Sequence, residues 1–278
     1  LWGEYKIIEG LVFKTQYSNN YDGYTYEFYQ PGNVTYNNGN ITRGSSKATT
    51  TRNWVFQNTL SYDKIFKDHH LNVLLGQSTE QQKYYLISAS ASGWPYESIE
   101  TLNVATTPTG ASTERTTYAN ASFFGRATYD YKEKYLLTVS ARYDGSSRFG
   151  SNTKWGWFPS VSAGWKINEE KFMENLDWIS LLKLRGAWGM SGNDRIGDYA
   201  YMALLGTYNT SWGDKKVSGV APSNIANEDL QWESTKSLDF GLDLSLIKNR
   251  LQLNFDYYVN TTDNLLFSVP IPYTTGFS

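Results

Sequence analysis

The side chains best suited to chemistry in this chain are aromatic rings that stand in polar segments rich in Asn, Thr, Gly and Ser. Rings of this kind offer apolar faces on which a ligand ring can stack. The candidates for substrate binding, on a sugar or similar ring, are Tyr24, Tyr26, Tyr29, Trp94, Tyr96 and Trp212. The same rings could instead pack within loops or form an aromatic belt at a membrane surface. The sequence leaves both interpretations open.

Bond-making chemistry has little support. The chain contains no G-x-S-x-G, H-E-x-x-H or P-loop motif. Glu97 with Glu100, or the pair Glu169-Glu170, could suggest a glycosidase, but nothing in the spacing brings two carboxylates to face each other across a substrate. The pair His69-His70 would point to opposite faces of a strand and could not readily hold one metal ion. We therefore predict no enzyme activity, no cofactor and no metal site.

Composition narrows the class further. The chain has 278 residues, 16% aromatic and only 19% charged, with a net charge of −2 and no cysteine. The lack of a basic excess argues against a nucleic-acid partner. The absence of cysteine excludes disulfides and thiolate chemistry. No run of about 18 apolar residues is present, so no transmembrane helix is expected.

The elements that must carry these side chains are long strands with period-two alternation. From Ala119 to Tyr131, every second residue is apolar, aromatic or small, and the interleaved positions are polar apart from Phe124. After a turn at 132–134 the same alternation runs from Tyr135 to Asp144. Successive side chains on a strand point to opposite faces, so this is a hairpin with one apolar and one polar face. Its length suits a membrane barrel, whose strands need about 9–11 residues.

The pattern recurs along the chain. A second clear hairpin spans 237–246 and 251–259, and shorter alternating series lie at 11–15, 53–62, 71–75, 157–167 and 182–188. The connections also alternate between short ones (8–10, 63–68, 132–134 and 248–250) and long ones (18–51, 81–117, 145–155 and 191–233). The connection 168–180 is intermediate in length and falls on the short-turn side by parity. Membrane barrels have short turns at one end and long loops at the other. The polar runs 17–26 and 36–40 are predicted to be loops, and 168–174 a short helix capped by Asn168.

The alternation also assigns side chains to the two faces. Four tryptophans are expected in the aromatic girdle or the lipid-facing wall, namely Trp155, Trp157, Trp165 and Trp188. The charges expected to face the lumen are Arg126, Arg142, Lys166, Arg185, Asp239, Asp243 and Asp256. They could line a substrate path, or they could form a solvated wall with cross-strand pairs. The second interpretation is the more common outcome for charges on a strand.

Several longer motifs in the second half of the chain add a family resemblance. In order, they are RYDGSSRFG (142–150), WGWFPSVSAGW (155–165), LKLRGAWG (182–189), SGND (191–194), NEDLQWESTK (227–236), NRL (249–251), VPIP (269–272) and TGF (275–277). Together these motifs resemble the barrel of the SusC/RagA family of TonB-dependent outer-membrane transporters. The match is strong over 118–278 and looser over 1–117.

This resemblance implies an all-β, antiparallel transmembrane β-barrel, of which residues 1–278 form part of a single barrel domain with about 10–12 strands. A larger barrel of about 22 strands with a plugged lumen is the architecture of such transporters, and nothing in this chain resembles the plug domain. The resemblance further implies import of glycans or peptides across the outer membrane, energised by TonB through the missing plug region. Its implied partners are a SusD-like surface lipoprotein as lid, outer-membrane lipid and a homodimer of the transporter–lipoprotein pair.

Two other functions compete with this interpretation. One is a TonB-dependent receptor for iron chelates or vitamins, which has the same architecture and a different cargo. The other is a secreted carbohydrate-binding β-sandwich, which accounts for the aromatic residues but not for strand length or for the alternation of short and long connections. A soluble β-rich glycosidase would additionally need a working carboxylate pair.

Overall fold

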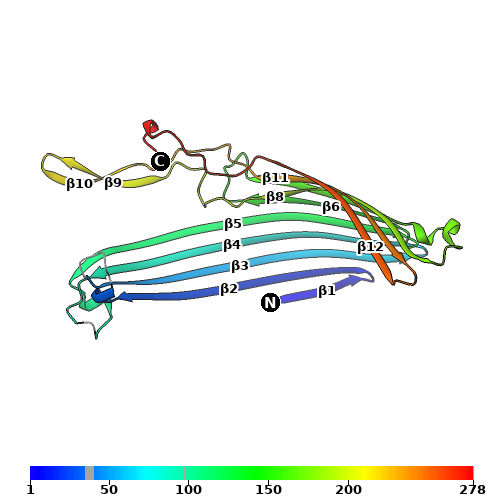
Figure 1. Cartoon of the computed structure of the whole chain (residues 1–278), viewed down its shortest axis with the longest axis horizontal. Helices are drawn as coiled ribbons and strands as arrows, with labels where there is room; N and C mark the ends of the chain where they lie inside the picture. Colours follow the sequence, from blue (N-terminus) through cyan, green and yellow to red (C-terminus); the bar gives the residue numbers. More distant parts are fainter. Residues whose placement is uncertain (35–40, 97, 278) are drawn as a thin grey trace. The chain divides into compact units, whose positions relative to one another are not determined.

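The computed structural model describes residues 1–34, 41–96 and 98–277. The predicted loop 36–40 therefore lies outside the described residues. Ten of the strands form one antiparallel sheet in the order β1-β2-β3-β4-β5-β6-β7-β8-β11-β12, and β9 and β10 form a separate hairpin (Figure 1). No helix among the described residues is long and apolar enough to cross a membrane. The all-β antiparallel prediction and the expected 10–12 strands are confirmed.

The strands of the first half are β1 (Trp2–Ile8), β2 (Leu11–Gln30), β3 (Arg43–Phe66), β4 (His69–Ser92), β5 (Thr107–Tyr131) and β6 (Tyr135–Ser146). Those of the second half are β7 (Trp155–Lys166), β8 (Ile179–Asn193), β9 (Leu205–Trp212), β10 (Lys215–Pro222), β11 (Glu233–Leu246) and β12 (Leu251–Asp263). Short 3-10 turns, η1 to η5, lie at Gly32–Val34, Leu102–Val104, Ile167–Glu169, Lys171–Met173 and Tyr273–Thr275.

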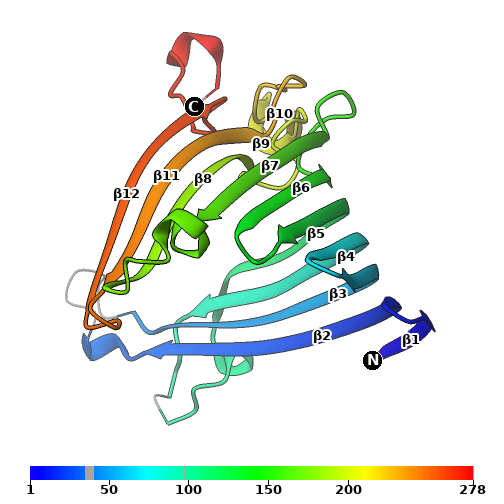
Figure 2. The ribbon, with the colours of Figure 1, turned by 90° about the vertical axis from the view of Figure 1, so that its right-hand side faces the viewer.

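The chain divides into two compact units, which are described separately. The first unit comprises Leu1–Gln16, Phe56–Thr79 and Asn120–Ser278, and the second comprises Tyr17–Val55 and Glu80–Ala119. In the first unit, β5 to β8, β11 and β12 lie side by side in register (Figure 2). The second unit contains the remaining lengths of β2 to β5 with the segments that join them.

The second unit corrects one prediction. The segments 18–51 and 81–117 were expected to be long loops, but most of their described residues belong to strands of 20 to 25 residues. The polar run 17–26, also predicted as a loop, lies wholly within β2. Its Tyr and Thr residues favour extended backbone, and the polar composition reflects exposure to water on both faces. Strands of this length exceed the about 9–11 residues that cross a membrane.

The tight turns of the first unit have the geometry that a hairpin needs. Lys132 and Glu133, at the β5–β6 turn, both have positive φ angles of 53° and 54°. The Lys134 amide donates to the Tyr131 carbonyl across this turn at 3.0 Å. Two central residues of left-handed backbone match the right-handed twist of the flanking strands. The predicted turn at 132–134 is thus confirmed, and the register runs unbroken from Tyr131↔Tyr135 to Asn120↔Ser146.

The register of β5 to β12 sorts the side chains by face, as the alternation predicts. We call the apolar face the one that carries the row Ala127–Val139–Val161–Trp188–Leu238, whose members pair in turn across the strands. The polar face carries the row that contains Ser162, Ala187 and Asp239. Many large apolar side chains remain exposed: on β12 alone these include Leu251, Leu253, Phe255, Tyr257 and Val259. An exposed apolar patch of this extent marks a contact with lipid or protein.

Two rows of rings bound this apolar face. At the tight-turn end, consecutive rings lie 4.8 to 6.3 Å apart between centroids, in the row Phe66–His69–Tyr131–Tyr135–Trp165. At the other end, Phe123, Tyr143, Trp155 and Trp157 form a second cluster. Tyr135 and Tyr143 are eight residues apart on β6, or roughly 26 Å along a strand. That span resembles the apolar band of about 25 Å, flanked by aromatic girdles, in membrane barrels.

Glu170 fixes the tight-turn end of this ring row. Its Oε1 accepts hydrogen bonds from the Tyr135 hydroxyl at 2.6 Å and from Trp165 Nε1 at 3.1 Å. Lys134 Nζ lies 3.8 Å from Oε2. The pKa of the Glu170 carboxyl is lowered chiefly by the hydrogen bond from Tyr135. The hydrogen bond from Trp165 and the positive charge of Lys134 lower it further.

The helix predicted over 168–174 is absent, and η3 and η4 take its place. Asn168 does not cap it: its Oδ1 accepts from the Leu182 amide at 3.1 Å, and its amide donates to Glu169. Glu170 accepts hydrogen bonds from Tyr135 and Trp165 on the neighbouring strands, and these tertiary contacts outweigh the local sequence preference for a helix.

We expect the stability of the protein to depend on the Glu170 charge. A carboxyl with a lowered folded pKa stabilises the fold fully above its unfolded pKa, and that stabilisation is lost as pH falls through the folded value. Glu170→Gln should therefore lower the urea unfolding midpoint of the full-length protein in detergent at pH 7, followed by tryptophan fluorescence. The difference from wild type should shrink as pH falls below the ordinary glutamate range. Glu133→Gln, in the neighbouring turn, is the control, and an equal loss in both variants would contradict the role of Glu170.

Candidate functional site

The polar face of β8, β11 and β12 carries a cluster of one arginine and three aspartates. Arg185 on β8 pairs directly with Gly241 on β11, and Gly241 pairs with Asp256 on β12. A Cβ at position 241 would overlap the guanidinium group, so the missing side chain is what lets Arg185 extend across β11. Arg185 Nη2 then donates to Asp256. Its Nε lies 3.2 Å from Asp243 Oδ1 and its Nη1 3.5 Å from Asp239 Oδ1.

This cluster accounts for four of the charges predicted to face the lumen. The structure brings Arg185, Asp239, Asp243 and Asp256 together as cross-strand pairs, which is the solvated-wall arrangement weighed above. Arg142, also predicted for this face, pairs with Asp144 at 3.0 Å and lies over the Phe124 ring at 5.1 Å. Since three carboxylates surround one guanidinium group in the Arg185 cluster, the cluster itself is net negative.

A hollow of about 320 Å³ lies beside Arg185 on the same face. Thr138, Ser162, Lys183 and Asp239 contribute its polar lining. Gly164 also lines it, and a Cβ there would make ordinary van der Waals contacts with Lys183 and Leu136. Hydroxyl groups and charges of both signs can bind a polar solute by hydrogen bonds and ion pairs. The arrangement therefore suits binding of a polar solute.

A second cluster ties together the segments that follow β6 and β8. We call it the loop core, and its polar members are Ser146, Arg148, Asp194 and Asp198. Ser146 is fully buried, and its hydroxyl donates to Asp194 Oδ2 at 2.8 Å. Arg148 Nε donates to Asp198 at 2.9 Å, and its Nη1 donates to the Asp194 carbonyl at 3.2 Å. Hydrogen bonds between charged groups in a partly buried place are the strong ones.

Aromatic packing completes the loop core. Phe149 is fully buried, and its ring centroid lies 5.2 Å from that of Trp232, which also meets Phe158 edge-on at 5.3 Å. The Trp232 indole donates to the Lys154 carbonyl at 3.0 Å, and Thr153 Oγ1 donates to the Leu230 carbonyl at 2.7 Å. Segments far apart in sequence are thereby held at one place, which explains why the motifs in 142–150, 155–165, 191–194 and 227–236 occur together.

A groove of about 790 Å³ adjoins the segments that the loop core positions. Its lining comes from three stretches, 195–200, 224–230 and 266–271, and the last of these includes the start of the VPIP motif. Arg195 is its one basic lining residue, and its other side chains are mainly apolar or amide. Sequence analysis recorded these motifs without assigning them a role, because spacing along the chain did not reveal that they converge.

The six aromatic residues predicted to bind substrate differ in the element that carries them and in their exposure to solvent. Tyr24, Tyr26 and Tyr29 lie on β2, so their placement in a loop was wrong. Trp94 is buried at 7% exposure, donates to the Thr101 carbonyl at 3.0 Å and packs against Gly44 and Tyr29. Tyr24, Tyr26, Tyr96 and Trp212 are exposed at 59%, 42%, 69% and 81%. Tyr96 follows β4, and Trp212 ends β9 in a hairpin that the sequence analysis did not predict.

The two adjacent histidines have separate surroundings. His69 stacks with rings of the apolar face, and its Nδ1 lies 2.6 Å from the Tyr129 hydroxyl, whereas His70 bridges Asp63 and Asp130 at 3.1 and 3.0 Å. They therefore point to opposite faces, as predicted. Within the described ranges, no group of three or more His, Asp or Glu side chains could hold a metal ion. Glu97 lies outside the described residues.

We expect the loop core to tolerate no side chain at Gly192. A Cβ there would overlap the Phe158 ring, and overpacking of this kind costs about 1–3 kcal/mol. Gly192→Val should therefore lower the free energy of unfolding of the full-length protein by that amount in a urea titration. Gly197→Val is the matched control, because nothing lies within 4 Å of a Cβ at that position. Equal unfolding midpoints for the two variants would contradict this packing.

We also expect Arg185 to stabilise the folded protein, because it separates and neutralises three neighbouring carboxylates. Arg185→Met keeps the length of the side chain but leaves Asp239, Asp243 and Asp256 to repel one another. The variant should unfold at a lower urea concentration than wild type, and adding Asp243→Asn should restore part of the loss. High salt should narrow the gap between Arg185→Met and wild type. A double variant no better than Arg185→Met would argue against charge repulsion.

Comparison with known proteins agrees with this architecture. The family model described as "TonB dependent receptor-like, beta-barrel" matches residues 3–278. TonB-dependent receptor P39 of Formosa agariphila is 42% identical over 98% of the chain, which covers 26% of that receptor. TonB-dependent receptor SusC of Bacteroides thetaiotaomicron is 41% identical over 59% of the chain and 17% of its own length. The chain thus spans about a quarter of P39 and less of SusC.

Solved structures give the same picture. A chain of the RagAB peptide transporter aligns with a TM-score of 0.89 and 30% identity, covering 99% of this chain and 31% of its own. The siderophore receptor PiuA from Acinetobacter baumannii aligns at 0.51 with 14% identity, over 92% of this chain and 38% of its own, which shows likeness of fold alone. The secreted β-sandwich alternative is therefore wrong: the chain belongs to the TonB-dependent receptor-like β-barrel family.

Proposed function

We propose that this chain is part of the barrel wall of a TonB-dependent outer-membrane importer for glycans or peptides. The importer would span the outer membrane many times, and residues 1–278 would form part of its single barrel domain. The plug domain and the TonB contact would lie elsewhere in the protein. Its work is binding and passage of a solute, with no chemical step, no cofactor and no nucleic-acid partner.

The observation that carries this proposal is that the chain aligns much better with a peptide transporter than with a siderophore receptor. The RagAB peptide transporter aligns over 99% of the chain with a TM-score of 0.89, whereas the siderophore receptor PiuA aligns at 0.51. The relative SusC shares 41% identity over the matched residues. Both comparisons favour the SusC/RagA branch over receptors for iron chelates or vitamins, which remain the second candidate function.

The proposed partners follow from the same branch. We infer a SusD-like surface lipoprotein that covers the long-loop end, with TonB acting from the other side of the membrane and with lipid around the apolar face. A homodimer of the transporter–lipoprotein pair belongs to the same proposal. The loop core supports a docking role for the long-loop end, because it holds three segments and the adjoining groove in one arrangement.

Among the predicted aromatic residues, the exposed ones are the better candidates for substrate contact. Tyr24, Tyr26, Tyr96 and Trp212 present rings to solvent, and Tyr29 adjoins Trp94. Trp94 itself, being buried, would support the second unit and not touch a ligand. A hollow of about 400 Å³ lies in the same unit, lined by Phe28, Arg43 and the serines of β3 and β4. It supplies polar groups that a sugar or peptide could use.

The cargo class is tested by growth. A strain of the native bacterium without the gene should lose growth on one glycan or on oligopeptides as sole nutrient, and a strain without TonB should lose it too. An affinity tag on the full-length protein should recover a surface lipoprotein from the outer-membrane fraction. Loss of growth only under limitation for an iron chelate or a vitamin would instead establish the second candidate function.

We expect Trp212→Ala to weaken substrate binding if the exposed rings act as stacking platforms. Loss of one aromatic contact is worth about 1 kcal/mol, or a factor of about five in affinity. Calorimetric titration of the purified transporter with the glycan or peptide identified by growth would measure this change. Trp178→Ala, an exposed ring between η4 and β8 at 55% exposure, serves as the control. Unchanged affinity in Trp212→Ala would remove Trp212 from the site.

A further inference from the structure

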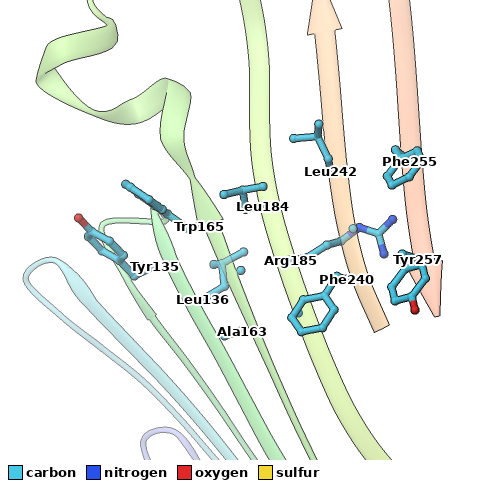
Figure 3. Close-up of a pocket in the computed structure, with 13 residues that line it drawn as sticks. Tyr135, Leu136, Ala163, Trp165, Leu184, Arg185, Phe240, Leu242, Phe255 and Tyr257 are labelled. Atoms are coloured by element: carbon cyan, nitrogen blue, oxygen red, sulfur yellow. The ribbon is translucent and has the colours of Figure 1, made fainter. Parts of the chain in front are cut away.

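The apolar face of β6, β7, β8, β11 and β12 contains a trough that the transport function does not use. Ala163 on β7 pairs with Gly186 on β8, and these two small residues form its floor. The trough has a volume of about 800 Å³. On one side stand Tyr135, Trp165 and Leu184; on the other stand Phe240, Leu242, Phe255 and Tyr257 (Figure 3).

One end of the trough is bounded by two rings that share a polar partner. Trp165 and Tyr135 bound the trough on the side of the η3–η4 turn (Figure 3). Both rings donate to Glu170 Oε1, and Lys134 Nζ lies 3.8 Å from the other carboxylate oxygen. The trough therefore runs from a charged, hydrogen-bonded end into a strip whose lining is mainly apolar, with Arg185 as its one charged residue. An amphipathic molecule with a charged head and a long apolar tail has the same polarity along its length.

The charges around this end are of both signs. The turn residues near Glu170 include the exposed cation Lys171 and the exposed carboxylate Glu174. The β11–β12 turn is joined to the same region, because the Ile247 amide donates to the Trp178 carbonyl at 2.7 Å, and it adds Lys248 and Arg250. A head that carries both a phosphate and an ammonium group can satisfy such a mixed edge, whereas a purely anionic head would meet the carboxylates as well.

We propose that the trough is a binding site for one acyl chain of a phosphatidylethanolamine molecule whose headgroup lies against the Glu170 end. The inference rests on the proposed function, because the apolar face meets lipid only if the protein spans the outer membrane. Lipid tails are as apolar as the trough, so burial alone does not select a lipid. Selection comes from dispersion contacts with the ring edges and small-residue floor, and from the headgroup charges.

The small floor residues make the site testable. Ala163→Leu would place a bulky side chain in the trough, while Ala127→Leu makes the same change elsewhere on the apolar face, opposite Val139. Full-length protein would be reconstituted in phosphatidylethanolamine vesicles that contain a diazirine on the acyl chain of a fraction of the lipid. After irradiation, mass spectrometry would locate the labelled peptides and compare their yield between variants.

In wild type we expect labelling concentrated on the peptides of Phe240 and Tyr257. Ala163→Leu should reduce it severalfold and Ala127→Leu should not. A diazirine-bearing phosphatidylglycerol should label the same peptides severalfold less, because its head lacks the ammonium group. Uniform labelling of the apolar face, or equal labelling of Ala163→Leu and wild type, would overturn the site. The site would also be overturned if a second copy of the chain covers the trough, which would be detected as a dimer that Ala163→Leu abolishes.

The two proposals can fail separately. Membrane fractionation and growth report on transport, while labelling in vesicles reports on the trough. The lipid site alone would be overturned if the protein lies in the outer membrane and its deletion abolishes growth as expected, but the labelling shows no preference for the trough. A protein absent from the outer membrane would overturn the proposed function and remove the basis of the lipid site.

Discussion

Pairing of every backbone amide and carbonyl between neighbouring strands is the constraint on which the rest of this structure depends. A strand at membrane depth can satisfy these groups only through its neighbours, which is why a β-protein must cross as a continuous sheet. Here the pairing runs without a register break through β5, β6, β7 and β8. Once that register is set, the period of two fixes the face of every side chain. The aromatic rows, the Arg185 cluster and the trough are consequences of this single geometric rule.

The same rule explains why so little of the chain is buried. In the described residues, the buried apolar side chains are Ala91, Trp94, Phe149 and Phe158, and none lies between two layers of sheet. A one-layer wall has no second layer of sheet to cover either of its faces. Packing energy of the kind found in globular cores is therefore available mainly where loops fold back, as at the loop core. Ser146, Asp194 and Trp232, each from a different family motif, meet there.

Sequence reasoning predicted the strands whose alternation is clean and failed where another interaction decides the conformation. The hairpins 119–144 and 237–259 were predicted because apolar positions repeat every second residue. The region 17–26 lacks that signal because both of its faces are polar, so the sequence predicts a loop there, although these residues continue β2. The predicted helix at 168–174 failed because Glu170 bonds to rings on β6 and β7, partners that no local pattern reveals.

The candidate sites show the same division. Alternation assigned the charges of the polar face, and four of them do meet. Alternation could not show that Gly241 leaves the space through which Arg185 reaches Asp256, because that depends on the cross-strand register. Ser146 with Asp194, 48 positions apart, could be found only in three dimensions.

The thinness of the wall couples its two faces at β7 and β8. Ala163 pairs with Gly186 and its neighbour Gly164 pairs with Arg185, so alternation directs adjacent residues to opposite faces, yet both Ala163 and Gly164 line the trough and the polar hollow. Arg185 and Gly186 likewise line both cavities. A substitution on this stretch that shifts the backbone would disturb both faces. Because Ala163 and Arg185 line both cavities, Ala163→Leu and Arg185→Met change the surroundings of the trough and of the polar hollow together.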